Sequence, residues 1–320
     1  TGILIEAKGD KLRMFATDLE FAVETYVNCE VIEEGSVVVP ADKFHRYVNK
    51  LPKEVIKVES DEHNKLTIKS DKGKVKFDVY QTEEFPAKEK FPEENDVKIE
   101  QSQLKYLFDR VKFATSNDDE HQPVLSGIKF HTEDGKMKTV ATNTFRLSYA
   151  EQKIDFDESF DVVLPQKVVN LMSRLLGENK VGITFKRSLV KFQLEETVVY
   201  SRVISGSYPN YKAIMPSDFN FESVIENEEF GSAIERMLVL GDKSIVNLGY
   251  RGGGFLVSSV SEAGSVNEGK ERIEVDYEGD KFETHLDGQY IMDALKVSNR
   301  DEVLFQGLGD EQPFIIKEKE

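Results

Sequence analysis

The stretch "VATNTFRL", Val140 to Leu147, is the part of the sequence that best reveals how the chain is built. It starts as an apolar β-type run and breaks at the three polar residues 142–144. It then places a cation, Arg146, between Phe145 and Leu147. The string "FATDLEF", Phe15 to Phe21, makes the same break earlier in the chain. A corner that occurs twice predicts an internal repeat.

Longer strings repeat in step with the corner. "GSVVVPADKFHRYVNKLP" (35–52) matches "SFDVVLPQKVVNLMSRLLG" (159–177), and both end a β-branched run at a proline that opens an amphipathic helix. A weaker third copy contains the helix "DGQYIMDALKVSN" (287–299). We therefore expect an α+β fold of three similar domains, 1–96, 97–218 and 219–320, each with helices on one face of an antiparallel sheet.

The repeat also predicts that the chain is clipped at both ends. Aligned with the second copy, the first copy lacks its first helix and strand, and the third copy lacks its last strand.

Composition restricts the class of protein. The 320 residues carry a net charge of −17 and a single cysteine, and no apolar run approaches the roughly 20 residues of a membrane span. We expect a soluble cytoplasmic protein without disulfides or membrane contact. The acidic total disfavours an ordinary nucleic-acid binder, although charge placement can override the sum.

The charges are segregated along the chain. Acidic residues gather in turns and loops, whereas the outer faces of the expected helices lean basic. The basic positions are Lys43, Arg46, Lys50, Lys105, Arg110, Lys112, Lys167 and Arg174. These are either ordinary solvated helix faces or one common basic surface shared by the repeats.

Catalytic and metal-binding patterns are missing from the sequence. The five histidines show no HExxH or paired ligand spacing, no GxxxxGK[ST] or GxSxG string occurs, and "RGGGFL" (251–256) reads as a hairpin turn. Adjacent acids such as Asp118 and Asp119 lie in loop-like stretches and make a poor case for a glycosidase or a metal nuclease. A non-enzymatic acidic β-rich binding or assembly scaffold is compatible with these exclusions.

The order and spacing of these features resemble one known family. Three helix-and-strand copies, the corner at 140–147, the segment "SGSYPNYKAIMP" (205–216) and "QPVLSGIKF" (122–130) are similar to the β sliding clamp of bacterial DNA polymerase III over essentially the whole chain. The resemblance implies the DNA clamp fold and a ring of two head-to-tail subunits. Duplex DNA would pass through the ring, with the basic helix positions facing it, without chemistry, cofactor or metal.

The resemblance also implies a pocket for short linear peptides of partners, namely the polymerase III catalytic subunit, the clamp loader and other replication and repair proteins. The matching positions are Leu125, Thr142, Thr144, Phe145, Arg146, Leu147, Pro209 and Ile214. Leu125, Leu147, Pro209 and Ile214 would supply apolar walls, and Thr142 and Arg146 the polar contacts.

A plainer interpretation of the corner stays open, in which residues 142–144 are a turn, Phe145 and Leu147 are core, and Arg146 makes a local ion pair. The family usually has an acidic residue, a small residue and then His or Tyr where this chain has Asn143, Thr144 and Phe145. Phe145 cannot donate a hydrogen bond, so the peptide preference is open.

Finally, the resemblance implies where two subunits would meet. The edge strand Lys74 to Tyr80 of one chain would contact the helix around residues 239 and 240 of the other. The expected contact side chains are Phe77, Val79, Val239 and Leu240, and Phe77 and Val79 should be exposed in a single chain.

Overall fold

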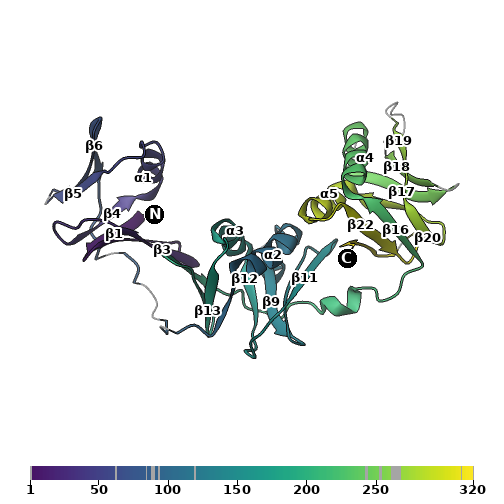
Figure 1. Ribbon diagram of the computed structural model, residues 1–320, viewed down its shortest axis with the longest axis horizontal. Helices are drawn as coiled ribbons and strands as arrows, with labels where there is room; N and C mark the ends of the chain where they lie inside the picture. Colours follow the sequence, from purple (N-terminus) through teal and green to yellow (C-terminus); the bar gives the residue numbers. More distant parts are fainter. Residues whose placement is uncertain are drawn as a thin grey trace. The chain divides into compact units, whose positions relative to one another are not determined.

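The structure is a computed structural model (Figure 1), which describes residues 2–61, 63–83, 85–87, 91–92, 94–118, 120–241, 244–251, 254–260, 268–310 and 312–319. The chain forms two compact units. The first comprises residues 1–108, 117–139 and 151–207, and the second comprises residues 109–116, 140–150 and 208–320. Within the described ranges, no helix is long and apolar enough to cross a membrane.

The elements follow the repeat read from the sequence. The first copy contains β1 (Gly2–Lys8), β2 (Lys11–Thr17), β3 (Phe21–Asn28), β4 (Gly35–Pro40), α1 (Ala41–Val48), β5 (Lys57–Asp61), β6 (Lys65–Ser70) and β7 (Gly73–Asp78). The second copy has the same order in β9 (Gly127–Glu133), β10 (Lys136–Thr142), β11 (Leu147–Lys153), β12 (Asp161–Pro165), α3 (Gln166–Leu175), β13 (Lys180–Lys186), β14 (Leu189–Gln193) and β15 (Thr197–Arg202).

Further elements precede and follow the second copy. These are β8 (Val97–Glu100), α2 (Gln101–Val111) and the short 3-10 helices η1 (Lys112–Ala114), η2 (Pro123–Ser126) and η3 (Tyr211–Ile214). The third copy contains β16 (Phe221–Glu226), α4 (Asn227–Leu240), β17 (Ile245–Arg251), β18 (Gly254–Ser259), β19 (Lys270–Ile273), β20 (Asp276–Gly279), β21 (Glu283–Asp287), α5 (Gly288–Val297), β22 (Glu302–Gly307) and β23 (Phe314–Glu318).

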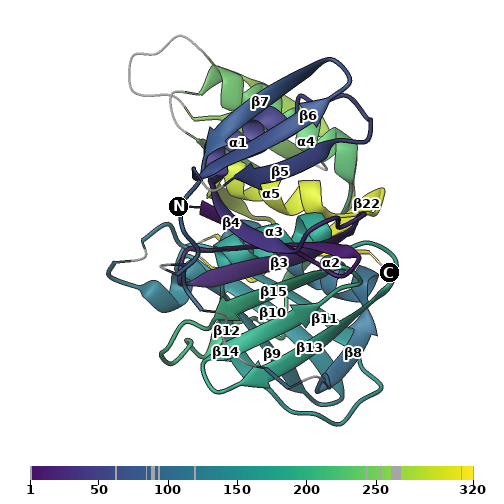
Figure 2. The ribbon, with the colours of Figure 1, turned by 90° about the vertical axis from the view of Figure 1, so that its left-hand side faces the viewer.

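The first two copies share one sheet. Its eight strands run β4-β1-β2-β3-β15-β14-β13-β8, so the third strand of the first copy pairs with the last strand of the second, as Figure 2 shows. The pairing is antiparallel, with Val23 opposite Val199 and Ala22 opposite Tyr200. β-branched and aromatic residues on both strands favour this extended pairing.

A buried carboxylate lies at this shared junction. Glu24 of β3 is 1% exposed. It accepts hydrogen bonds from Arg13 Nε at 2.5 Å, from the Tyr26 hydroxyl at 2.8 Å and from the Tyr200 hydroxyl at 2.8 Å. Burial and the hydrogen bond to Glu24 raise the pKa of Tyr200 well above its usual range. The network therefore links β2, β3 and β15 with each polar group satisfied.

The apolar residues of α2 form one buried stripe. Leu104, Leu107, Phe108 and Val111 are fully buried in α2. Their spacing puts all four on one helix face. In the second unit, α4 and α5 pack on each other and on β17 and β18, and the core beneath them is rich in phenylalanine, including Phe230, Phe255 and Phe305.

Candidate functional site

The corner at 142–146 is a turn held by its own side chains. The Thr142 hydroxyl donates to the Arg146 carbonyl at 2.7 Å and accepts from the Thr144 amide at 3.1 Å. The Asn143 side-chain oxygen accepts from the Phe145 and Arg146 amides at 3.1 and 3.0 Å. Thr144 sits at φ +76°, a left-handed conformation that a β-branched residue seldom adopts. The side chains of Thr142 and Asn143 are therefore used to form the turn itself.

The corner of the first copy has the same geometry. The Thr17 hydroxyl donates to the Phe21 carbonyl at 2.9 Å and accepts from the Leu19 amide at 3.0 Å. The Asp18 carboxylate accepts from the Glu20 and Phe21 amides. Leu19 takes the same φ of +76° as its counterpart in the second corner. The break that occurs twice in the sequence is thus the same turn in both copies. Arg146 occupies the position that Phe21 holds in the first copy.

Arg146 is tied to helix α5 within the second unit. Its Nη1 lies 2.6 Å from Asp293 Oδ2, and its Nη2 donates to the Phe113 carbonyl at 2.5 Å. The guanidinium lies over the ring of Tyr290 at 4.2 Å and over that of Phe113 at 5.1 Å. Asn143 adds a hydrogen bond to the Tyr290 hydroxyl at 3.2 Å. The Arg146 side chain keeps 18% of its surface, so it does not project freely into solvent.

An apolar surface accompanies this corner in the second unit. Phe145 is 84% exposed, which rules out the interpretation of Phe145 as a core residue. Ile214 and Met215 of the neighbouring segment are also exposed, as is Pro209, and Leu147 is half-buried. Exposed large apolar side chains on a folded domain commonly mark a binding surface.

The segment 208–214 is anchored to the strands that bear the corner. The Tyr208 hydroxyl donates to the Val140 carbonyl of β10 at 3.3 Å, and burial raises the pKa of that hydroxyl above its usual range. The Tyr211 ring packs on Tyr149 of β11 with centroids 5.9 Å apart. The aromatic-proline segment and the corner, far apart in sequence, are therefore held together.

Two expected pocket residues do not offer the surface assigned to them. Thr142 is 6% exposed and its hydroxyl is used inside the turn, so the expectation that it orients a peptide is wrong. Leu125 is a core residue, because the η2 turn directs its side chain inward. The plainer interpretation of a local ion pair at Arg146 is also wrong, since its partner Asp293 is remote in sequence.

The basic helix positions divide into exposed and engaged side chains. Those exposed to solvent are Lys43, Arg46 and Lys50 in the first copy and Lys167 and Arg174 in the second. Arg46 pairs with Asp42 at 2.5 Å. In the second copy, Lys112 pairs with Asp109 at 2.5 Å, and Lys105 donates to the Ser173 carbonyl of α3. The exposed cations of α1 and α3 therefore lie on helices that occupy equivalent places in the two repeats.

The expectation that Arg110 faces DNA is wrong. Its side chain is buried, at 8% exposure for the residue, and Nη2 lies 2.5 Å from Glu318 of β23. Arg110 follows Leu107 by three positions, so it lies at the border of the buried stripe instead of opposite it. Its charge serves an ion pair within the second unit.

The expected exposure of Phe77 and Val79 is also wrong. Phe77 is 9% exposed and belongs to the core of the first copy, where its ring meets those of Phe44 and Tyr47 at centroid distances of 6.0 and 5.6 Å. Alternation along β7 and the residue after it turns Phe77 and Val79 inward and leaves the polar side chains of the strand outside. Val239, by contrast, is 85% exposed, and Leu240 beside it is also exposed.

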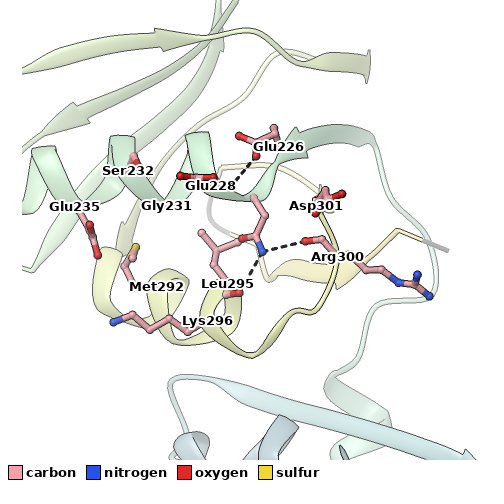
Figure 3. Close-up of a pocket in the computed structure, with 11 residues that line it drawn as sticks. Glu226, Glu228, Gly231, Ser232, Glu235, Met292, Leu295, Lys296, Arg300 and Asp301 are labelled. Atoms are coloured by element: carbon pink, nitrogen blue, oxygen red, sulfur yellow. Dashed lines mark hydrogen bonds between the residues drawn. The ribbon is translucent and has the colours of Figure 1, made fainter.

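The helices of the third copy carry a different surface. A groove of about 330 Å³ lies between α4 and α5 (Figure 3). Its floor includes Gly231, Met292 and Leu295, and its lining carries the carboxylates of Glu226, Glu228, Glu235 and Asp301 with only two cations, Lys296 and Arg300. This helix face is net acidic, which the charge pattern of the first two copies did not predict.

Comparison with known families shows which family the chain belongs to. Models of the DNA polymerase III beta subunit match the chain in three consecutive pieces: the N-terminal domain over residues 1–89, the central domain over 98–210 and the C-terminal domain over 212–320. The chain belongs to the DNA polymerase III beta subunit family. Members of this family are beta sliding clamps, which are non-catalytic subunits of the polymerase holoenzyme.

Individual beta sliding clamps are similar over nearly all of the chain. The clamp of Bacillus subtilis is 27% identical over 333 residues, covering 99% of this chain and 88% of the relative. That of Halalkalibacterium halodurans is 28% identical over 335 residues, covering 99% and 87%. The crystal structure of the Bacillus subtilis clamp superposes with a TM-score of 0.91 at 27% identity, covering 99% of this chain and 87% of that one. The beta subunit from Pseudomonas aeruginosa gives 0.91 at 25% identity, covering 100% and 88%. These comparisons confirm the clamp fold.

Nothing in the described part of this clamp is arranged as a metal centre. No group of three His, Cys, Asp or Glu side chains is placed there to hold an ion. Asp118 pairs with His121, whose backbone and side-chain hydrogen bonds lower the pKa of the Asp118 carboxyl, and Asp119 lies outside the described residues.

Sequence reasoning missed the partners of the corner of this clamp. Tyr290 and Asp293 belong to the helix expected at 287–299, where nothing marks them as site residues, yet they hold Asn143 and Arg146. The one available signal was the cation between two apolar residues, which requires a counter-charge, but the sequence does not say where that charge lies.

Proposed function

We propose that the chain is a DNA sliding clamp that encircles duplex DNA as a ring of two subunits and tethers the replicative polymerase to it. The three domains, 1–96, 97–218 and 219–320, would form one half of the ring. The observation that carries this proposal is that α1 and α3, the helices that follow β4 and β12 in the two repeats, both carry exposed cations. Lys43 and Arg46 on α1 are exposed, as are Lys167 and Arg174 on α3, and exposed Lys50 lies two residues after the end of α1.

The charge on these helices suits loose, sequence-independent contact with phosphates. A chain of net charge −17 would repel DNA except where cations are concentrated. Lysine and arginine on exposed helix faces contact phosphates without reading bases. Retention on DNA would then come from ring topology, and the cations would keep the duplex centred while it slides.

For the subunit contact, the open edge of β7 and the exposed pair Val239 and Leu240 support a head-to-tail arrangement. β7 pairs with β6 at the edge of a three-stranded sheet, and among the described residues only Tyr80, just beyond β7, is bridged on its other side, to Val38 of β4. An open edge of this kind is a ready partner for a strand of another chain. Backbone pairing replaces the side-chain contact through Phe77 that the family resemblance implied.

For the tether, the apolar surface at Phe145, Leu147, Pro209 and Ile214 supports binding of short linear peptides from the polymerase, the clamp loader and other replication proteins. The side chains are mostly exposed and apolar, and they lie beside a rigid turn. Such a surface suits an extended peptide with apolar anchors.

A topological experiment tests the ring. The protein is loaded by the clamp loader of the same organism onto nicked circular DNA and separated by gel filtration. We expect co-elution with the circle and release when one restriction cut makes the DNA linear. An acidic binding or assembly scaffold would not co-elute at all, and a groove-binding protein would remain bound after the cut. Either result would overturn the clamp proposal.

A further inference from the structure

The groups around Arg146 determine which peptides the corner surface accepts, a statement that rests on the proposed peptide-binding function. Asp293 takes one of the two terminal nitrogens of the Arg146 guanidinium, and the Phe113 carbonyl takes the other. One of the Asp293 oxygens, Oδ2, lies 2.6 Å from Arg146 Nη1. The other, Oδ1, accepts from the Gln289 side chain at 3.0 Å, so the carboxylate is held in place from its own helix.

The remaining groups around the guanidinium are uncharged. Phe113 and Tyr290 face it with their rings, and the Phe113 carbonyl takes the second terminal nitrogen. The Arg146 Nε is buried and has no hydrogen-bond partner within the described residues, so the guanidinium is not saturated with acceptors. Asp293 is the only carboxylate that hydrogen-bonds to it in this part of the chain.

A neutral ion pair beside an apolar surface selects against charge in a ligand. A peptide carboxylate approaching Arg146 must compete with Asp293, and it meets like charge at short range. Phe145 beside it, with Pro209 and Ile214 on the neighbouring segment, offers apolar contact that an uncharged peptide can use at once.

We propose that Asp293 is a specificity-determining residue of the clamp's partner site, which neutralises Arg146 and so makes the site prefer uncharged apolar peptides to peptides that carry a carboxylate next to the apolar anchor. Removal of the Asp293 carboxylate leaves a partly buried cation without its counter-charge. That cation then becomes a strong point of attraction for an acidic ligand.

The probes are two fluorescein-labelled pentapeptides of leucine and phenylalanine that differ only in a central aspartate or asparagine. Binding to the whole protein is followed by fluorescence anisotropy. The wild type should bind the asparagine peptide several-fold more tightly. In Asp293→Asn, affinity for the aspartate peptide should rise about ten-fold relative to the asparagine peptide, because a charge-assisted hydrogen bond to Arg146 becomes available.

Three companion variants assign the effect. Asp161→Asn removes an equivalent carboxylate that pairs with Lys129 at 2.7 Å, and it should leave the preference unchanged. Arg146→Met in the Asp293→Asn background should abolish the gain. Gln289→Ala, which releases Asp293 without removing its charge, should shift the preference in the same direction by a smaller factor and serves if Asp293→Asn unfolds.

The outcomes separate this inference from the function on which it rests. If both peptides bind and Asp293→Asn leaves their affinity ratio as in the wild type, the role of Asp293 is refuted while peptide binding stands. A fall in affinity for both peptides together would mean that Asp293 only supports the fold, which also refutes the role. If neither peptide binds the wild type at any concentration, both the pocket and the inference are overturned.

Discussion

Replacement of Glu24 by alanine would test whether the shared eight-stranded sheet depends on its buried carboxylate. The substitution removes the partner of Arg13 and leaves the Tyr26 and Tyr200 hydroxyls without their acceptor. Breaking a buried ion pair by deleting one member costs about 3 to 5 kcal/mol. Arg13 keeps 21% of its side-chain surface and retains Glu6 at 2.9 Å, so we expect the lower end, about 3 kcal/mol.

The measurement must be local, because a chain of 320 residues with two compact units need not unfold in one step. Hydrogen exchange of the amides of β3 and β15 reports opening of this junction directly. We expect those amides to exchange roughly 100-fold faster in Glu24→Ala, which is what a loss of about 3 kcal/mol implies. Amides of β17 and β18 in the second unit should keep their rates.

The matched control is Glu196→Ala. Glu196 pairs with Lys11 at 3.4 Å across the same two copies, but its side chain is 56% exposed. An exposed pair of this kind contributes about 0 to 1 kcal/mol, so exchange at the junction should change little. If Glu24→Ala behaved like this control, or if it accelerated exchange equally in β17 and β18, the carboxylate would not be what holds the junction.

Burial and charge also determine the effects of three other substitutions. Phe77→Ala should lower the free energy of unfolding of the first copy by about 3 to 5 kcal/mol, because the ring fills the core there. Urea unfolding followed by tyrosine fluorescence measures this loss. A variant as stable as the wild type would show that Phe77 is not a core residue. Hydrogen bonds from Lys57 and Lys69 lower the pKa of Glu59 to about 2. A carboxylate with a lowered pKa stabilises the folded state at pH values above the ordinary pKa of glutamate, and this stabilisation is lost as the pH falls towards 2. In Glu59→Gln the free energy of unfolding should therefore depend less steeply on pH in the acid range. Lys167→Ala should weaken loading on DNA modestly and reduce the salt slope by about one, and an unchanged slope would remove Lys167 from the DNA-facing surface.

The part of the fold that the sequence predicted is the part that local spacing determines. Four apolar residues of α2 recur at helical intervals and are all buried. The corner was recognisable because Thr142 and Asn143 act on backbone groups no more than four residues away. Such short-range interactions depend only on residues that are close in sequence, so they can be predicted from a single sequence.

The contacts of the site were not predictable in the same way. The pair formed by Arg146 and Asp293 joins residues that are 147 positions apart. The sequence around either residue does not indicate which residue is its partner. The error at Phe77 has a different origin. The alternation of polar and apolar residues from Lys74 to Val79 already indicated that Phe77 faces inward. The family resemblance suggested an exposed contact there, and the periodicity was the better guide.

The two corners show why a repeat can keep its geometry and change its chemistry. In both copies a threonine hydroxyl and an Asx side chain satisfy the backbone of the turn, so the residues that follow are free to vary. The first copy places Phe21 at the last position of the turn, where it continues into the shared sheet. The second copy places Arg146 there, and the cation reaches α5 instead. The first corner is thus held to its neighbour by strand pairing, and the second by the ion pair of Arg146. Only the second corner also carries an exposed aromatic side chain, Phe145, that a partner can contact.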